Sequence, residues 1–569
     1  MAFYKTVFRN LDHQQSLLTM PQNDNLYKVL EAKFMEVAER PAFMMPDAGA
    51  LAHDALAHDA LTHDALTYGA LAEGVARMAG ALRGLGVRPD DRVMVQVEKS
   101  IDNVMLYLAV LKLGAIYNPL NTAYTARELD YFIGDAEPAL VVVTPARLAA
   151  VQSIADKCSL ANKCNRPAVT TLDADGSGSL ADLARTAQPV RETAPRRADD
   201  LAALIYTSGT TGRSKGAMLS HDNLLSNAMV LHDYWGFIEG DVLLHALPIF
   251  HVHGLFIALH TAFLNGSSIF WLPKFDADAV MALLPRATVM MGVPTFYTRL
   301  LARQEFGRAM CRNMRLFISG SAPLLAETHV EFEARTQCKI LERYGMTEAG
   351  MITSNPYKDA ERIAGTVGYA LPGVEARVAD EDGKILRPDK VGVLEVKGRN
   401  IFSGYWRNLE KTKEEFRDDG YFITGDLAQM AADGRIRIVG RAKDLIITGG
   451  LNVYPKEVEE ELNALDGIKE SAVIGVPHSD FGEGVIAVIV ACSKSGSGSE
   501  TGTGSETDSD SGTAAAPGDE GDIIAALAER LAKFKLPKRI FTAKELPRNA
   551  MGKVQKNELR TRFAGTFAD

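Results

Sequence analysis

The run Tyr-Thr-Ser-Gly-Thr-Thr-Gly-Arg-Ser-Lys-Gly at residues 206–216 has the residue types of a phosphate-binding loop. Its glycines leave backbone N–H groups accessible, its hydroxyls can donate hydrogen bonds, and Arg213 and Lys215 add positive charge. It is not a Walker A loop, because that motif needs a hydroxyl residue directly after its lysine, whereas Gly216 follows Lys215. A flexible surface turn is the alternative, but two cations close behind an apolar stretch favour phosphate binding.

Three further stretches carry residue types suited to a nucleotide. The segment 316–324 is a strand-like run that ends in small residues, which leave room for a flat base such as adenine. In the later Glu-Arg-Tyr-Gly-Met-Thr-Glu segment, Tyr344 could stack on a base, Thr347 could bond a phosphate and Glu348 could hold Mg²⁺. Asp426 follows a glycine after an apolar run, a place suited to a carboxylate that bonds ribose hydroxyls. Taken singly, each stretch is also compatible with a turn or a polar loop.

Two lysine-bearing segments lie nearer the end of the chain. Residues 440–455 include Arg441 and Lys443 and separate two regions of different texture, as a passive linker also would. Lys553 follows a glycine in an expected exposed loop, where most lysines are merely solvated. Neither segment specifies chemistry alone.

Length and composition set the class of protein. A chain of 569 residues is too long for one core and predicts two to four domains. Its formal net charge of −10 argues against a general nucleic-acid binder. No apolar run has the length of a membrane helix, and the N-terminus lacks a secretory apolar segment. Five cysteines without metal-ligand or disulfide spacing indicate reduced thiols, so we expect a soluble, cytoplasmic protein.

The elements that must position these residues follow an α/β pattern. Helix-like and strand-like stretches alternate in the first part of the chain, which predicts largely parallel sheets. Short strands from about 365 to 440 predict a β subdomain, which closes a large domain of residues 1–442. A small α+β domain follows at 443–569. Its acidic, polar stretch 493–522 cannot bury enough apolar surface to order itself, so we expect a disordered insertion.

A five-residue unit repeats in tandem at residues 51–66 and places His53, His58 and His63 at equal spacing. On a helix, a spacing of five turns successive side chains by about 140°. They would not share one face, so an expanded surface loop or a helix edge is favoured over a metal site.

Taken in order, these segments resemble the adenylate-forming superfamily, which includes acyl-CoA synthetases, luciferases and peptide-synthetase adenylation domains. The resemblance covers about residues 25–565 and implies ATP, Mg²⁺ and coenzyme A as ligands. In particular, it implies that Asp426 and Arg441 hold the ribose, and that Ser321 and Ala322 line the adenine pocket. The residues that it implies for ATP and AMP are Thr207, Ser208, Gly209, Thr210, Thr211, Gly212, Lys215, Ser321, Ala322, Arg343, Tyr344, Gly345, Met346, Thr347, Asp426, Arg441 and Lys553.

The same resemblance implies the catalytic parts. Lys553 would be the lysine of the adenylation step, and Glu348 with Thr207 would hold Mg²⁺ beside the cation Lys215. Lys443 would be the hinge about which the last domain rotates between half-reactions. Gly449 and Gly450 would lie beside the pantetheine arm of coenzyme A.

Two residues bear on the acid that is activated. His251 lies in an otherwise apolar run, and Arg299 is the one cation of residues 289–301. A fatty acid would favour apolar groups here, whereas an arginine suits a second carboxylate. Alternatively, Arg299 lies on a solvated helix face and His251 in the core. The surrounding segments closely resemble malonyl-CoA synthetases, which implies that Arg299 holds the distal carboxylate of malonate, assisted by His251 and Ser319 or Ser321.

The resemblance therefore implies ATP-dependent ligation of malonate to coenzyme A through a malonyl-adenylate, with AMP and diphosphate as products. The alternatives are a ligase for methylmalonate or another short acid, and a stand-alone enzyme that loads a carrier protein. A non-catalytic sensor of nucleotide or acyl-CoA would be expected to lose Lys553 or Glu348, and both are present. The expected partners are the small-molecule substrates, with no nucleic acid, membrane or obligate protein.

Overall fold

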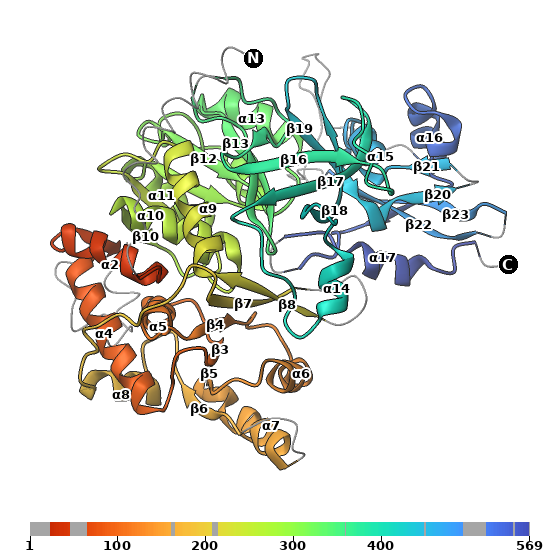
Figure 1. Ribbon diagram of the computed structural model, residues 1–569. Coiled ribbons are helices and arrows are strands. Elements are labelled where there is room, and N and C mark those ends of the chain that lie inside the picture. The colour runs from red at the N-terminus through yellow and green to blue at the C-terminus, as the bar shows by residue number, and fades with distance from the viewer. Residues whose placement is uncertain are drawn as a thin grey trace, which may run out of the picture.

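The structure is a computed structural model that combines four β-sheets with helices packed around them (Figure 1). The expected α/β class is thereby confirmed. The structure describes residues 23–45, 65–160, 166–207, 214–358, 360–448, 451–478, 480–492, 519–549 and 552–567.

The first sheet has six strands, all parallel except the last, which is antiparallel to its neighbour. Helix α5 (Ile101–Lys112) is buried along its whole length, which its nearly unbroken apolar sequence requires. The strands, in spatial order, are β6 (Ala168–Thr171), β5 (Leu140–Val143), β3 (Arg92–Gln96), β4 (Ile116–Pro119), β7 (Leu201–Thr207) and β8 (Lys215–Ser220). The other helices of this region are α4 (Tyr68–Gly84), α6 (Ala126–Ala136), α7 (Leu148–Leu160) and α8 (Ser179–Thr186).

The second sheet has nine strands, of which the central six run parallel. In spatial order they are β15 (Tyr369–Ala370), β14 (Gly350–Ser354), β13 (Ile340–Met346), β12 (Leu316–Ser319), β11 (Val289–Gly292), β9 (Val242–His245), β10 (Ser268–Trp271), β1 (Pro41–Met44) and β2 (Ala65–Thr67). Its helices are α2 (Leu26–Glu36), α9 (His221–Tyr234), the π-helix η3 (His253–Leu259), α10 (His260–Asn265), α11 (Ala277–Leu283), α12 (Pro294–Leu301) and α13 (Ala326–Thr336).

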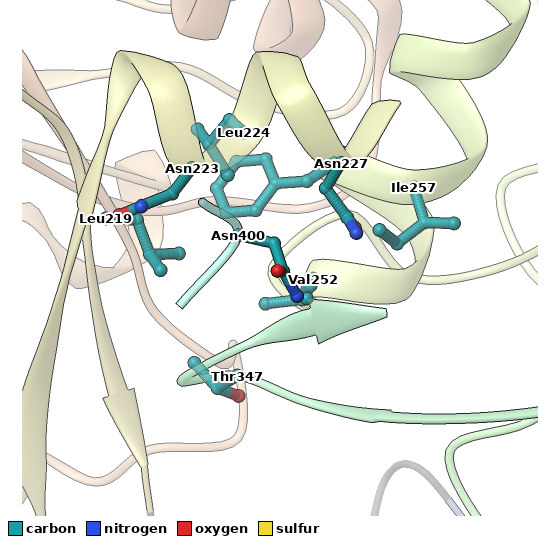
Figure 2. Close-up of a pocket in the computed structure, with 10 residues that line it drawn as sticks. Leu219, Asn223, Leu224, Asn227, Val252, Ile257, Thr347 and Asn400 are labelled. Carbon is teal, nitrogen blue, oxygen red and sulfur yellow. The ribbon is translucent and has the colours of Figure 1, made fainter. Parts of the chain in front are cut away.

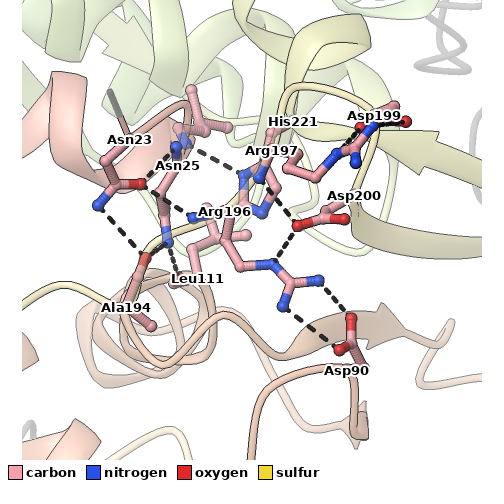
Figure 3. A network of polar contacts seen from close by, with 11 residues as sticks. Asn23, Asn25, Asp90, Leu111, Ala194, Arg196, Arg197, Asp199, Asp200 and His221 are labelled. Atoms are coloured by element: carbon pink, nitrogen blue, oxygen red, sulfur yellow. Dashed lines mark hydrogen bonds and ion pairs between the residues drawn. The ribbon is translucent and has the colours of Figure 1, made fainter. Parts of the chain in front are cut away.

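A polar network joins the two large sheets through their helices (Figure 3). Asn25 caps α2 and donates to the carbonyl of Leu111, at the end of α5 (2.8 Å). Arg196 pairs with Asp200 (3.0 Å). His221, the first residue of α9, accepts the N–H of the first residue of α2 through Nδ1 (3.1 Å). Burial lowers the pKa of His221 to about 4, so this histidine is neutral at physiological pH.

Two smaller sheets complete the fold. The expected β subdomain region holds an antiparallel sheet of β16 (Val374–Ala379), β17 (Val391–Gly398), β18 (Phe422–Met430) and β19 (Ile436–Arg441), with α14 (Leu409–Glu414) beside it. The last sheet has its own apolar cores and contains β20 (Ile446–Thr448), β21 (Leu451–Val453), β22 (Ile468–His478), β23 (Gly482–Ala491) and β24 (Arg539–Ala543). Its helices are α15 (Pro455–Asn463), α16 (Glu520–Ala528) and α17 (Lys556–Phe563).

The structure contradicts some of the expectations, and others concern residues outside the described ranges. Of the stretch 493–522, residues 493–518 lie outside the described residues, but Asp519 caps α16, so disorder is the wrong expectation for 519–522. The histidines of the repeat also lie outside the described residues. Cys158 is disulfide-bonded, so the expectation of five reduced thiols is wrong for this residue. Within the part of the chain that the structure describes, no helix combines the length and apolarity needed to span a bilayer.

Candidate active site

The expected phosphate loop connects two antiparallel strands. Thr207 ends β7, Lys215 begins β8, and the two residues pair across the ladder. The loop therefore leaves the sheet where the parallel strand β7 ends, and carboxyl ends of such strands are the usual ligand side of an open α/β sheet. Five of the predicted phosphate-binding residues lie outside the described residues and stay predictions: Ser208, Gly209, Thr210, Thr211 and Gly212.

The turn that carries Thr347 and Glu348 joins β13 to β14 and is held by amide side chains from distant parts of the chain. Asn227 of α9 donates to Met351 O (2.9 Å) and accepts the N–H of the same residue (3.0 Å). Asn400 donates to Ala349 O (2.7 Å). Figure 2 shows Asn227, Asn400 and Thr347 around a cavity of about 10 Å³, roughly the room for one water molecule. These contacts fix the turn behind the site.

Glu348 lies at the centre of the site. The hydroxyls of Thr207 (3.4 Å) and Tyr405 (3.1 Å) both donate to its Oε1. Its side chain is buried, and desolvation raises the pKa of the carboxyl. One carboxylate beside a hydroxyl fits Mg²⁺, which commonly takes one or two carboxylates and completes its shell with phosphate oxygens and water. No cluster of three or more acidic, histidine or cysteine ligands occurs among the described residues, so no all-protein metal cage is seen there.

The predicted ribose-binding residues meet where β18 and β19 pair. Arg441 Nε pairs with Asp426 Oδ1 (2.7 Å), and the Tyr344 hydroxyl donates to Asp426 Oδ2. Burial raises the pKa of Asp426, while Arg441 opposes that rise. Tyr344 thus contacts Asp426 through its hydroxyl. Gly345 and Met346 complete β13 beside it.

Three of the four predicted acid-binding residues lie at the end of β12 and on the segment before η3, namely Ser319, Ser321 and His251. Ser319 is buried, and its Oγ has no partner among the described residues. Ser321 has a left-handed backbone (φ 70°), and its Oγ lies 3.2 Å from His253 Nδ1. Ala322 follows it, half-buried. His253 N–H donates to His251 Nδ1 (3.3 Å), and burial lowers the pKa of His251 to about 3, so the neutral ring carries its proton on Nε2.

Arg343 is a buried cation in this group. Its side chain is almost inaccessible to water, and neither Nε nor Nη2 has a hydrogen-bond partner among the described residues. Gly320 makes room for the guanidinium, because a Cβ there would lie 2.3 Å from Arg343 Cζ. Burial lowers the pKa of Arg343 to about 9. A buried guanidinium with unused donors calls for an anionic ligand.

Arg299 is the exception among the predicted residues. It lies on α12, whose buried side chains are Phe296, Tyr297, Leu300 and Leu301, and its own side chain is on the exposed face. It lines an open surface hollow together with Phe275 and Arg303. The expectation that Arg299 reaches a buried acid pocket is therefore wrong for this structure, and Arg299 lies on a solvated helix face, because the helical period that buries its neighbours turns it outward.

The last domain contributes Lys553 to the site. Its side chain reaches water but lies among the charges of Asp426, Glu348, Arg343 and Arg441, and desolvation is the main cause that lowers its pKa. Gly552 lies against Thr295 of α12. Lys443 is exposed on the 3₁₀ turn Ala442–Asp444, where the chain leaves β19. Gly449 and Gly450 lie outside the described residues and stay predictions.

The sequence alone does not identify several residues that hold the predicted site residues in place. Tyr405, Asn227 and Asn400 contact the Glu348 turn, yet nothing in their local sequence marks them. Lys99 donates to His245 Nδ1 (2.9 Å), and His245 Nε2 donates to Gly254 O (2.9 Å), which fixes the start of η3 next to His253. Only the fold brings these partners together.

Comparisons with known proteins show similarity over most of the chain. The family model described as AMP-binding enzyme matches residues 40–406, and the one described as AMP-binding enzyme C-terminal domain matches residues 457–553. A malonate–CoA ligase of Arabidopsis thaliana is 33% identical over 506 residues, which cover 84% of this chain and 79% of that protein. The mitochondrial malonate–CoA ligase ACSF3 of Mus musculus is 34% identical, with 84% and 82% covered.

One solved structure is more similar still. ATP-bound MatB from Rhodopseudomonas palustris is 49% identical, covers 96% of this chain and 100% of its own, and has a TM-score of 0.84. A feruloyl-CoA synthase of Amycolatopsis is 34% identical over 493 residues, which cover 86% of this chain and 92% of that protein. Sequence identity near one third therefore does not distinguish which acid is activated. The residues of the acid pocket must provide that distinction.

Proposed function

Because this chain belongs to the AMP-binding enzyme family, we propose that it ligates malonate to coenzyme A, with ATP as the activating substrate. The acid is first joined to AMP, and coenzyme A then replaces AMP, so that the products are malonyl-CoA, AMP and diphosphate. The malonate–CoA ligases among its relatives and the 49% identity to MatB support malonate as the acid.

The single observation in the structure that carries this proposal is the buried Arg343. A malonate ion has a second carboxylate that does not react, and burying that charge without a partner would be very unfavourable. Arg343 offers donors at Nε and Nη2 that no described residue uses. The proposed distal-carboxylate site is therefore Arg343, with the Ser319 hydroxyl, the Ser321 hydroxyl and His251 Nε2–H as further donors. A monocarboxylic fatty acid would leave this cation unpaired.

The rest of the site suits adenylation. A carboxylate is a poor electrophile, because its charge is delocalised and its leaving group would be oxide. In the proposed step, a malonate oxygen attacks the α-phosphorus of ATP, the bond to the bridging oxygen breaks, and diphosphate leaves with the electron pair. Lys553 would offset the charge that develops at the α-phosphate, and Thr347 would bond an oxygen of the same phosphate. Holding both anions side by side lowers the barrier further.

Mg²⁺ would be held by Glu348 and Thr207, and when bound it would neutralise phosphate charge and orient the leaving group. Lys215 would pair with the terminal phosphates, and Asp426 with Arg441 would position the ribose. In the second half-reaction, the coenzyme A thiolate attacks the acyl carbon and AMP leaves. Neither half-reaction requires an oxidant or a reductant.

We place the boundary between a large domain (1–442) and a small domain (443–569) at Lys443. The charge of Lys553 interacts with those of Asp426 and Glu348, so this arrangement would suit the adenylation step. Thioester formation needs room for the pantetheine arm, and a rotation at Lys443 would withdraw Lys553 and bring Gly449 and Gly450 to the site. Such backbone changes are typically absorbed at a few residues between rigid domains.

A diphosphate-release assay with a panel of acids tests the proposal. Malonate should support release with ATP and turnover with coenzyme A, whereas acetate and octanoate should be poor substrates. Methylmalonate reports how much room lies beside the central carbon. Faster turnover with octanoate than with malonate would refute the assignment of the acid, while leaving the adenylation chemistry intact.

A further inference from the structure

The segment 403–406 lies alongside β8 and extends the edge of the six-stranded sheet. Met218 N–H donates to Gly404 O (3.0 Å), Ser403 N–H donates to Met218 O (3.0 Å), and Trp406 N–H donates to Gly216 O (2.8 Å). Tyr405 lies between these bonded residues and is buried. Its position is therefore fixed relative to the strand that begins at Lys215.

The Tyr405 hydroxyl joins two carboxylates. It lies 2.7 Å from Glu415 Oε2 and 3.1 Å from Glu348 Oε1. Phe402 packs edge-on against the ring, with 4.9 Å between centroids. Glu415, at the end of α14, is thus anchored to the centre of the nucleotide site, although it is distant from Glu348 in the sequence.

Glu415 also pairs with the lysine of the phosphate loop. Lys215 Nζ lies 3.6 Å from Glu415 Oε1 and 4.9 Å from the centroid of the Tyr405 ring. The Lys215 side chain is 10% exposed, so this pair is shielded from water more than a surface pair is. Among the described residues, Glu415 is the one carboxylate within ion-pair distance of Lys215. Lys411 Nζ lies 3.2 Å from the same Oε1.

We propose that Glu415 is a positioning residue that competes with the phosphates of ATP for the Lys215 ammonium. Glu415 holds the ammonium when the phosphate site is empty, yields it when ATP binds, and takes it back when diphosphate leaves. The inference rests on the proposed function in one respect only, namely that Lys215 contacts the terminal phosphates. It assigns Glu415 a role in nucleotide and diphosphate exchange that is independent of which acid is activated.

The physical reason is competition between two anions for one cation. The ammonium has three N–H donors, but each donor that Glu415 retains is unavailable to phosphate, and the carboxylate also repels the phosphate at short range. Removing the charge of Glu415 should therefore tighten both ATP and diphosphate. Tighter product binding slows release, so KM for ATP and kcat should fall together.

The matched variants are Glu415→Gln and Glu414→Gln. Glu414 carries the same charge one residue away, its side chain is 66% exposed, and it pairs with Lys411 (3.0 Å) but not with Lys215. The dissociation constants of ATP and of diphosphate are measured by calorimetry, without malonate or coenzyme A. We expect Glu415→Gln to lower both constants three- to tenfold, and Glu414→Gln to change them by less than twofold.

A double-mutant cycle separates direct exchange from a general change of charge. In a Lys215→Ala background, Glu415→Gln should tighten ATP and diphosphate much less, because the contested ammonium is absent and only the direct repulsion between Glu415 and phosphate is relieved. Glu415→Asp, which keeps the charge on a shorter side chain, should give an intermediate shift and serves if the glutamine variant does not fold. Unchanged or weaker ATP binding in the Glu415 variants, or equal tightening in the Lys215→Ala background, would overturn the proposal. If the wild-type protein itself bound no ATP, the proposed function would be refuted instead.

Discussion

Replacing Arg343 by methionine should weaken malonate binding while making the empty enzyme more stable. Methionine has a similar reach and no charge, so the substitution removes the buried guanidinium with little change in packing. Burial lowers the pKa of Arg343 from its ordinary value to about 9, which corresponds to roughly 5 kcal/mol against keeping the charge in the empty site. Part of that cost should return as a higher melting temperature of the variant.

The pH dependence follows from the sign of this effect. Arg343 is protonated in both the folded and the unfolded protein below about pH 9, so its destabilising contribution is fully present at neutral pH. As the pH rises above about 9, the folded protein releases this proton before the unfolded one does, and the contribution diminishes. The stability gained by Arg343→Met should therefore be largest at neutral pH and smaller at pH 10.

Arg343→Met removes one buried, charge-assisted hydrogen-bonding group from the proposed malonate site. Such groups contribute about 1.5–3 kcal/mol, which predicts a rise in KM for malonate of roughly 10- to 150-fold. KM for ATP should change much less. Malonate should also raise the melting temperature of the wild-type protein but not that of the variant. The measurements are diphosphate release at varied malonate and thermal unfolding with and without malonate.

Arg299→Ala is the matched control, because Arg299 is exposed and makes no ion pair with a described residue. We expect less than a threefold change in KM for malonate from this substitution. If Arg299→Ala costs as much as Arg343→Met, Arg299 must turn inward when malonate binds, and the assignment of Arg343 as the main partner is refuted. A melting temperature that falls in Arg343→Met would contradict the argument from desolvation.

Three further predictions concern other parts of the molecule. Lys553→Ala should abolish diphosphate release but spare thioester formation from preformed malonyl-adenylate; equal loss of both steps would contradict the two-conformation scheme. Asp426→Asn should raise KM for ATP at least tenfold, because it removes the charge that pairs with Arg441 and accepts from Tyr344, and a change of less than twofold would exclude a role at the ribose. Neutral His221 contributes to the stability of the folded protein above its unfolded pKa of 6.5. This contribution, up to about 3 kcal/mol, is lost as the pH falls from 6.5 through about 4. His221→Gln, which keeps an acceptor but does not titrate, should therefore lose less stability between pH 7 and pH 5 in urea unfolding, whereas a loss as steep as in the wild type would exclude His221.

Much of the architecture could be predicted from sequence periodicity. The alternation of helix and strand predicted the parallel sheets, because buried parallel strands and their covering helices leave distinct apolar patterns. The strands β16 to β19 lie in the region, about 365 to 440, where short strands are expected. The order of the motifs also drew attention to Glu348, Asp426 and Lys553, which the fold brings to one site.

The acid pocket could be predicted only in part. A cation in an apolar stretch predicts Arg299 as a partner for a second carboxylate, but on a helix the same stretch places one residue in the core and the next in water. For Arg343 the resemblance implies only a role with ATP or AMP, because nothing in its local sequence shows that its nitrogens lack partners. Tyr405 and Glu415 could not be found at all, because their contacts with Glu348 and Lys215 join segments far apart in the chain.

The segment 403–406 has a consequence for solubility. Without it, β8 would present a row of free backbone donors and acceptors at the rim of a large sheet, and such rims invite pairing between molecules. The strand is shielded by the same residues that hold Tyr405. Substitutions that loosen this segment should first appear as aggregation during expression, so an inactive variant here should be judged from the soluble fraction alone.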